Sequence, residues 1–506
     1  MKAYNIILKG ASISLFGLVF SRLISYITTI IISKTGSTNL GLLNLGLSVV
    51  SFIAMIFLLG LHGGVLRYVS YYLGKKNKER IKGAITSALK IAISSGILSM
   101  ILVLIFAKQI SINIFNKPEL TNIITIFAFM IPFLMLIEIF SSIFLSFKKI
   151  GYNVAIRDIG EKIIRLFLVG LAIYLGFNLK GITYAYLFTT LLIFILILYL
   201  LRKKEFHLFN KKINAKFNTR ELIIYSLPLI LTSLLTLLQK WADTFILGFY
   251  RTASEVGIYN ISFSTAALLA IIPTALMSLF IPVITDLYGQ NKIKDIKRIS
   301  NIVAKWIFMV NVPLSLSLII FAKDLLRIVF GQEYILGYVA LDILAISYLI
   351  LSITHVYASN LLMVKKTKLL SFLVFISTSL NILLNIILIP KFGIVGAAIA
   401  TLVSTIIFLI SMIISSLVII KLQPLDLSFI KIIFSVILSG FMLIYIKGFL
   451  KLNLFIIILL GLLMLIIYII FLFILKCFSK EDINLVKELK NKINYKLNNL
   501  NIFNNK

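Results

Sequence analysis

Long apolar runs separated by short polar segments make up most of this chain. A helix needs roughly 20 apolar residues to cross the hydrocarbon core of a bilayer, and the runs reach about that length. Leu and Ile dominate them, and no small-residue cleavage site follows the first run. The pattern predicts an all-α integral membrane protein with about fourteen transmembrane helices, at residues 11–33, 40–62, 83–107, 121–146, 157–177, 181–201, 222–247, 257–285, 300–322, 338–362, 369–389, 392–420, 428–447 and 452–476.

The order of these runs contains an internal repeat with an offset of about 215 positions. Leu40-Gly41 returns as Val256-Gly257, and Lys148-Lys149 returns as Lys365-Lys366. Duplicated bundles of membrane helices are typical of secondary transporters, which build a central site between two halves. We therefore expect two pseudo-symmetric six-helix lobes followed by two extra helices. The predicted division is 1–210 for the first lobe, 211–421 for the second, 422–478 for the two additional helices and 479–506 for a basic cytoplasmic tail.

The distribution of basic residues predicts how the helices are oriented in the membrane. The formal net charge is +32, and basic residues collect in every second loop, as at 75–82, 202–220 and 292–298. Positively charged loops are retained in the cytoplasm, so we predict a multi-pass protein of the cytoplasmic membrane with both termini inside. Short loops without interleaved aromatic residues argue against nucleic-acid binding. The apolar spacing at 481–496 predicts an amphipathic helix on the inner leaflet, which makes membrane lipids an expected partner.

The sequence offers few of the features that an enzyme active site needs. The single cysteine, Cys477, excludes an internal disulfide and a cysteine-based metal site. No external loop is long enough to fold a catalytic domain. We expect neither enzyme activity nor a cofactor.

Ionisable residues inside the apolar runs are expensive there and by default mark functional positions. Arg22 lies midway along the first run. Because a guanidinium stays charged and binds phosphate oxygens bidentately, we predict substrate binding, with a buried ion pair or snorkelling to the membrane surface as the alternatives. Lys240 and Asp243 lie one turn apart and either neutralise each other or bind substrate and cation separately. Glu138 is a candidate substrate contact or a neutral hydrogen-bonded carboxyl. An ion-pair cluster is predicted at the cytoplasmic start of the fifth helix, from Arg157, Asp158, Glu161, Lys162 and Arg165.

Two polar pairs lie at helical spacing near the end of the second repeat. Asn381 and Asn385 share one helix face, and Thr401 and Thr405 share another. Polar pairs inside membrane bundles often hold helices together. Converging carbonyl, hydroxyl and carboxylate oxygens would instead form a site for a hard cation such as Na⁺.

Several motifs resemble those of polysaccharide flippases. They are the run Tyr225-Ser226-Leu227-Pro228-Leu229, the Phe330-Gly331-Gln332-Glu333-Tyr334 element and the Gly396-Ala397-Ala398-Ile399-Ala400-Thr401 run. The resemblance extends over residues 5–478 and implies membership of the multidrug, oligosaccharidyl-lipid and polysaccharide exporter superfamily, in its O-antigen or teichuronic-acid-like flippase branch. It implies translocation of a lipid-linked oligosaccharide from the inner to the outer leaflet by alternating access, with glycan assembly proteins as further partners.

The family is similar to lipid II flippases, and this similarity implies functional residues. Ser21-Arg22-Leu23 matches a first-helix motif whose arginine faces a cationic cavity. Asn385 stands where lipid II flippases can have a carboxylate, which weakens the implied cation affinity. Ser262-Phe263 occupies the region of an eighth-helix cavity arginine, and a second first-helix arginine is absent near Thr28, so a substrate other than lipid II is expected. The implied Na⁺ site comprises Asp243, Asn381, Asn385, Ala397 and Thr401.

Two other functions compete with this interpretation. A cation-coupled multidrug or toxin antiporter of the same superfamily usually stops at twelve helices and has an acidic cavity, whereas fourteen runs and Arg22 are present here. An integral-membrane polysaccharide polymerase or glycosyltransferase would need a sizeable external loop. A purely structural scaffold would leave the buried charges as an unexplained cost.

Overall fold

Helices form every regular element that the structure describes. The structure is a computed structural model that describes residues 2–203, 213–216, 219–420 and 427–478. The α-helices of the first part are α1 (Lys2–Ser33), α2 (Ser37–Phe57), α3 (Leu61–Gly74), α4 (Lys78–Gln109), α5 (Leu120–Ala128), α6 (Ile131–Ser146), α7 (Ile150–Asn153), α8 (Glu161–Tyr174) and α9 (Asn178–Lys203). Those of the second part are α10 (Thr219–Tyr250), α11 (Ala253–Ala266), α12 (Ile271–Gly289), α13 (Ile293–Leu325), α14 (Tyr338–Met363), α15 (Thr367–Ile420), α16 (Leu427–Lys447) and α17 (Leu454–Ile474).

Short π- and 3₁₀-helical segments continue several of these helices. The π-helical segments are η1 (Ile110–Ile114), η2 (Val154–Gly160) and η4 (Leu326–Phe330). The 3₁₀ segments are η3 (Ala267–Ala270) and η5 (Gln332–Gly337). Such interruptions are tolerated at membrane depth where the backbone is enclosed by protein or lines a cavity.

The all-α membrane fold is confirmed. Eleven of the described helices are long and apolar enough to cross a membrane, and the bent pair α5–α6, with 47° between its parts, makes twelve if it is one span. Helix α15 covers the two predicted spans 369–389 and 392–420 and has a non-helical residue, Gly393, at the start of the second. The Ser377 hydroxyl donates to the Ser404 carbonyl at 3.2 Å, so the two halves of α15 run antiparallel. The total of fourteen spans stays a prediction.

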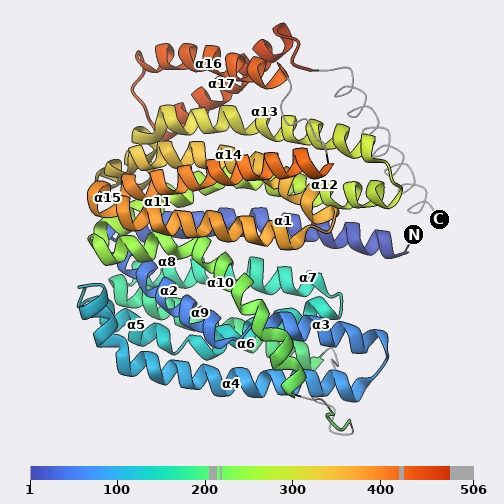
Figure 1. The fold of residues 1–506 in the computed structure, drawn as a ribbon. Helices are drawn as coiled ribbons and strands as arrows, with labels where there is room; N and C mark the ends of the chain where they lie inside the picture. The colour runs from blue at the N-terminus through green and yellow to red at the C-terminus, as the bar shows by residue number, and fades with distance from the viewer. Residues whose placement is uncertain (1, 204–212, 217–218, 421–426, 479–506) are drawn as a thin grey trace, which may run out of the picture.

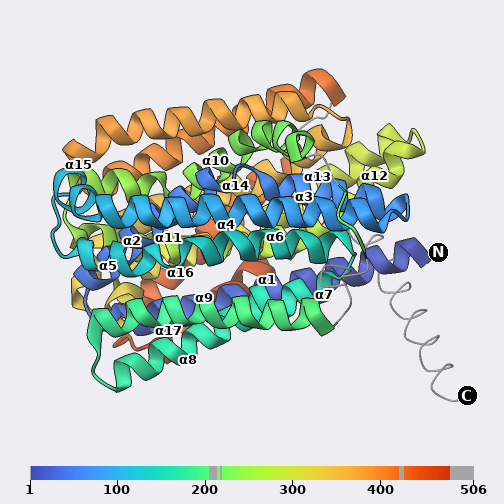
Figure 2. The ribbon, with the colours of Figure 1, turned by 90° about the horizontal axis from the view of Figure 1, so that it is seen from below.

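The two copies of the repeat meet where α2 and α11 pack side by side (Figures 1 and 2). Gly41 and Gly257 are equivalent in the repeat, and a Cβ atom on either would collide with the backbone of the opposite helix. Glu333 accepts hydrogen bonds from the Ser37 amide at 3.0 Å and its hydroxyl at 2.6 Å. These contacts join the helices at the end of the bundle that is predicted to lie outside.

Helix α10 runs between the two parts of the bundle (Figure 1). It contacts α3, where Arg67 stacks on the ring of Tyr225 at 4.1 Å, and it also contacts α2 and α15. The predicted lobe boundaries near 210 and 421 and the tail 479–506 lie outside the described residues, so the division into domains stays a prediction.

Helices α16 and α17 pack on α13 at one edge of the bundle (Figure 1). The Tyr468 hydroxyl donates to the Met309 carbonyl at 2.9 Å. The Lys447 ammonium donates to the Ile320 carbonyl and pairs with Asp324, each at 2.7 Å. The two helices without a repeat copy therefore extend the second part of the bundle.

Candidate functional site

Asp243 of α10 is the centre of a polar cluster that joins three helices. Its carboxylate accepts hydrogen bonds from the hydroxyl of Tyr259 on α11, from Asn385 Nδ2 at 2.6 Å and from Thr401 Oγ1 at 2.9 Å. Asn381 extends the cluster, because its Oδ1 accepts from Asn385 at 3.1 Å and its Nδ2 lies 3.4 Å from Thr401 Oγ1. The four polar residues of the implied Na⁺ site therefore converge. The fifth, Ala397, is buried one turn before Thr401 and has only a backbone carbonyl to offer.

The turn inside α15 brings the two polar pairs together. Pro390 removes a backbone donor, and Gly393 has a φ of +56°, a left-handed conformation that L side chains rarely adopt. Arg251 donates to the carbonyls of Ile389 and Pro390, each at 3.1 Å, and so holds the turn. Because the chain reverses here, Thr401 returns to the level of Asn381.

The oxygen atoms of this cluster fit a hard cation. Asn385 is fully buried, and its Oδ1 has no hydrogen-bond partner among the described residues. An unsatisfied buried acceptor is costly, and a cation beside Asp243 would satisfy it. Carboxylate, amide and hydroxyl oxygens are the ligand types that hard cations prefer. Tyr259, which the sequence does not single out, completes the cluster from α11, because the partner of its hydroxyl lies on another helix.

Lys240 and Asp243 form no ion pair among the described residues, so they do not neutralise each other; their separate roles stay a prediction. Its ammonium lies 4.9 Å from the ring of Trp241. It interacts electrostatically with Lys162, Arg165 and Glu161 of α8. Lys240 is an exposed side chain on α10, with the ion pairs of α8 as its charged neighbours.

Glu138 of α6 forms an ion pair with Arg157 of η2. In the neighbouring first turn of α8, Glu161 pairs with Lys162 at 2.9 Å and with Arg165. The predicted ion-pair cluster of the fifth helix thus forms for these residues, with Glu138 as an added partner. The isolated carboxyl expected from the sequence has a counter-ion, and its role as a substrate contact stays a prediction.

Arg22 lies at the same depth as this ion-pair cluster. Helices α1 and α8 run side by side, with Ile27 and Ile31 lining one groove with Leu166 and Gly170. This register places Arg22 level with the first turn of α8. Its Nη1 lies 3.4 Å from the carbonyl of Ala267, and it has no carboxylate partner among the described residues.

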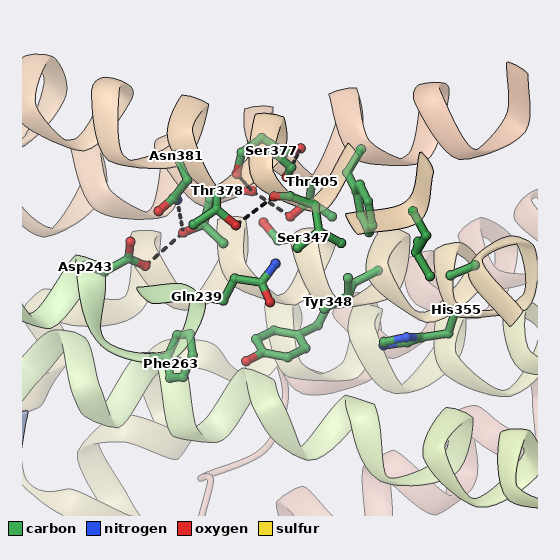
Figure 3. Close-up of a pocket in the computed structure, with 17 residues that line it drawn as sticks. Gln239, Asp243, Phe263, Ser347, Tyr348, His355, Ser377, Thr378, Asn381 and Thr405 are labelled. Atoms are coloured by element: carbon green, nitrogen blue, oxygen red, sulfur yellow. Dashed lines mark hydrogen bonds between the residues drawn. The ribbon is translucent and has the colours of Figure 1, made fainter. Parts of the chain in front are cut away.

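A cavity of about 350 Å³ adjoins the Asp243 cluster (Figure 3). Helices α10, α11, α14 and α15 line it, and Asp243 and His355 lie toward opposite ends of the view. Tyr348, on its wall, lies near enough to both Arg22 and Asp243 that a charge on its phenol oxygen would feel both. The cation-rich and the acidic parts of the site are therefore within electrostatic reach of one another.

Two family models match the chain. The model described as "Polysaccharide biosynthesis protein" matches residues 7–288, and the model described as "MatE" matches residues 228–387. The first covers more than half of the sequence.

Curated relatives and solved structures are consistent with these matches. The "Probable low-salt glycan biosynthesis flippase Agl15" of Haloferax volcanii is 31% identical over 37% of this chain, and the match spans only 40% of that relative. The "Uncharacterized membrane protein MJ1068" of Methanocaldococcus jannaschii is 25% identical over 78% of this chain and 80% of its own length. The structure of "Lipid II flippase MurJ, inward closed conformation" aligns with a TM-score of 0.70 at 20% identity, covering 91% of this chain and 97% of that one. At this identity the last comparison shows the fold.

Proposed function

The chain belongs to the polysaccharide biosynthesis protein family of the exporter superfamily, and we propose that it is a flippase for a lipid-linked oligosaccharide. The headgroup enters the space between α1, α8 and α10, the lipid tail stays in the bilayer, and the helices rearrange so that the headgroup leaves on the other side. No covalent bond of the substrate is broken or formed. The relative named as a probable glycan biosynthesis flippase supports this assignment.

The observation that carries the proposal is positive charge at one depth of the bundle, at Arg22 and around Lys240. Arg22 has no carboxylate partner among the described side chains, and Lys240 faces Lys162 and Arg165 with Glu161 as the nearest counter-ion. Positive charge that remains uncompensated at this depth is costly unless it serves an anionic ligand. A phosphate that links the glycan to its lipid has the charge and oxygen geometry to bind these residues, and Arg22 can bind it bidentately.

The coupling ion binds, in this proposal, at Asp243, Asn381, Asn385 and Thr401, with Ala397 at the edge of the site. The single carboxylate gives such a site a net charge of −1. Na⁺ suits its oxygen ligands. The alternative energy source is the membrane potential acting on Arg22, worth about 2.3 kcal/mol per charge per 100 mV for a full crossing.

We place the protein in the cytoplasmic membrane with both termini inside, on the strength of the alternating basic loops. Cysteines introduced at 292–298 and 108–117, in a Cys477→Ala background, test this orientation. A membrane-impermeant reagent added outside intact cells is expected to label the second loop only. Lipids around α16 and α17, the lipid tail and glycan assembly proteins are the proposed partners.

A cation-coupled drug antiporter is the second candidate, and the MatE match over residues 228–387 favours it. Cationic drugs would meet Arg22, Lys162, Arg165 and Lys240 at the centre of the bundle, and like charges repel. The geometry therefore supports an anionic substrate better.

Reconstitution distinguishes the two candidates. Vesicles that contain the purified protein and a fluorescent lipid-linked oligosaccharide are expected to make the inner-leaflet pool accessible to an added glycosidase. The same vesicles are expected to leave a cationic dye undisturbed. Dye exchange without glycolipid movement would overturn the flippase proposal.

A further inference from the structure

The cavity beside Asp243 has a wall of hydroxyl groups that point their hydrogens away from it. Ser347 donates to the Ile343 carbonyl at 2.9 Å, Thr378 to the Val374 carbonyl at 2.8 Å and Thr405 to the Thr401 carbonyl at 2.7 Å. A hydroxyl has one hydrogen and two lone pairs. With the hydrogen bonded to the helix, only lone pairs remain for the cavity, and this wall therefore attracts cations and repels anions.

The cavity extends from the Asp243 cluster toward one end of the bundle. On α14 its lining progresses from Ser347 to Ala358, roughly 16 Å at the helical rise, toward the end of the helix at Met363. Lys365 and Lys366 follow, so this is the end predicted to face the cytoplasm. At the near end Asp243 is half-buried, whereas His355 toward the far end is exposed.

We propose that this cavity is a vestibule through which a hard cation passes between the Asp243 cluster and the cytoplasmic end of the bundle. The hydroxyl oxygens of Ser347, Thr378 and Thr405 act as its successive ligands. This inference rests on the proposed cation site at Asp243 and adds to it a route and the groups that line the route.

Isosteric loss of two ligands tests the route. In Thr378→Val with Thr405→Val, shape is kept and two oxygens are removed; exchange of radioactive Na⁺ is expected to slow roughly tenfold, because each lost polar contact costs about as much as a hydrogen bond. The equilibrium affinity at Asp243 is expected to stay within about twofold. Thr236→Val is the matched control, because Thr236 makes the same hydrogen bond to its own helix at 3.0 Å but lies exposed outside the cavity.

Cysteine labelling supplies an independent measurement on a single substitution. In a Cys477→Ala background, Thr378→Cys is expected to react with a positively charged thiol reagent from the cytoplasmic side, and Na⁺ is expected to slow the reaction. A negatively charged reagent of similar size is expected to react more slowly. Protection by the glycolipid headgroup but not by Na⁺ would assign the cavity to sugar and overturn the vestibule.

The outcomes separate this inference from the proposed function. If the native protein binds Na⁺ and Asp243→Asn does not, the cation site stands. Unchanged exchange in the double valine variant then overturns the vestibule alone. Absence of Na⁺ binding to the native protein overturns both the cation site and the vestibule, whereas the vesicle assay still decides the flippase assignment.

Discussion

Asp243 and Glu161 are both carboxylates inside the helix bundle, yet their partners differ in charge. Asp243 accepts its hydrogen bonds from uncharged groups on α11 and α15, whereas Glu161 lies against Lys162 and Arg165. A buried charge needs either an opposite charge or several hydrogen bonds. The first solution leaves the negative charge of Asp243 available to a cation. In the second solution one carboxylate, Glu161, pairs with two cations, Lys162 and Arg165. A net positive charge therefore remains for an anion.

The two regions are close enough to influence each other. Tyr348 of α14 lies near enough to both Arg22 and Asp243 that a charge placed on its hydroxyl would feel both. A phosphate at Arg22 makes the surroundings of Asp243 more negative and should tighten cation binding. By linkage, the cation must tighten phosphate binding by the same factor. The contrast between the regions therefore provides a physical basis for coupling.

Loss of Arg22 should have the largest effect. We expect Arg22→Ala to reduce glycolipid flipping by about 100-fold or more, because a bidentate contact consists of two charge-assisted hydrogen bonds of about 1.5–3 kcal/mol each and no other residue replaces them at this position. Arg22→Lys should recover part of the activity, since it keeps the charge without the bidentate fork. The vesicle assay measures both. Lys90→Ala, which removes an exposed charge from α4, is the control, and equal loss in that variant would argue against a specific role for Arg22.

Neutralising Asp243 should affect the cation and spare the anion. Asp243→Asn keeps the size of the side chain and is expected to weaken Na⁺ binding by about 10- to 100-fold, the range for a charged contact. Binding of a lipid phosphate analogue, measured without Na⁺, should change little. Calorimetric titration of both ligands gives the two affinities. If phosphate affinity falls as far as Na⁺ affinity, the two regions are not separate sites.

A second carboxylate beside Asp243 should make this region more selective for a cation. Asn385→Asp places a negative charge beside Asp243 Oδ1, where the native amide nitrogen lies at 2.6 Å. We expect Na⁺ affinity to rise about tenfold, because the ion relieves the repulsion between two adjacent carboxylates. Without Na⁺ the variant should melt at a lower temperature than the native protein. A melting temperature that does not respond to Na⁺ would contradict a cation between these residues.

The sequence predicts the site best where spacing along one helix decides which side chains lie on the same face. Asn381 and Asn385 share a face because they lie one turn apart, and the Pro390–Gly393 break separated two predicted spans. The sequence predicts partners on other helices less well. Spacing within α10 allowed Lys240 to pair with Asp243, but the neighbouring helices supplied other contacts to each residue. The partner of Glu138 depends on how η2 packs against α6, which no local pattern contains.

Removing the Tyr348 hydroxyl should have the smallest effect, and it tests the link between the regions directly. Tyr348→Phe keeps the ring and its edge contact with Phe263, whose centroid lies 5.9 Å away. The hydroxyl is the only polar group removed between Arg22 and Asp243, so each ligand alone should bind within about twofold of the native affinity. The factor by which a saturating lipid phosphate tightens Na⁺ binding should fall by about two- to threefold, within the usual range of a modest coupling energy.

The measurement is a pair of Na⁺ titrations, with and without phosphate, in the native protein and in the variant. Thermodynamic reciprocity supplies an internal control, because phosphate titrations with and without Na⁺ must yield the same factor. An unchanged factor in Tyr348→Phe would mean that the charges interact through the cavity itself and not through this residue. A factor of one in the native protein would mean that cation and anion bind independently. In that case the membrane potential acting on Arg22 becomes the better account of how transport is driven.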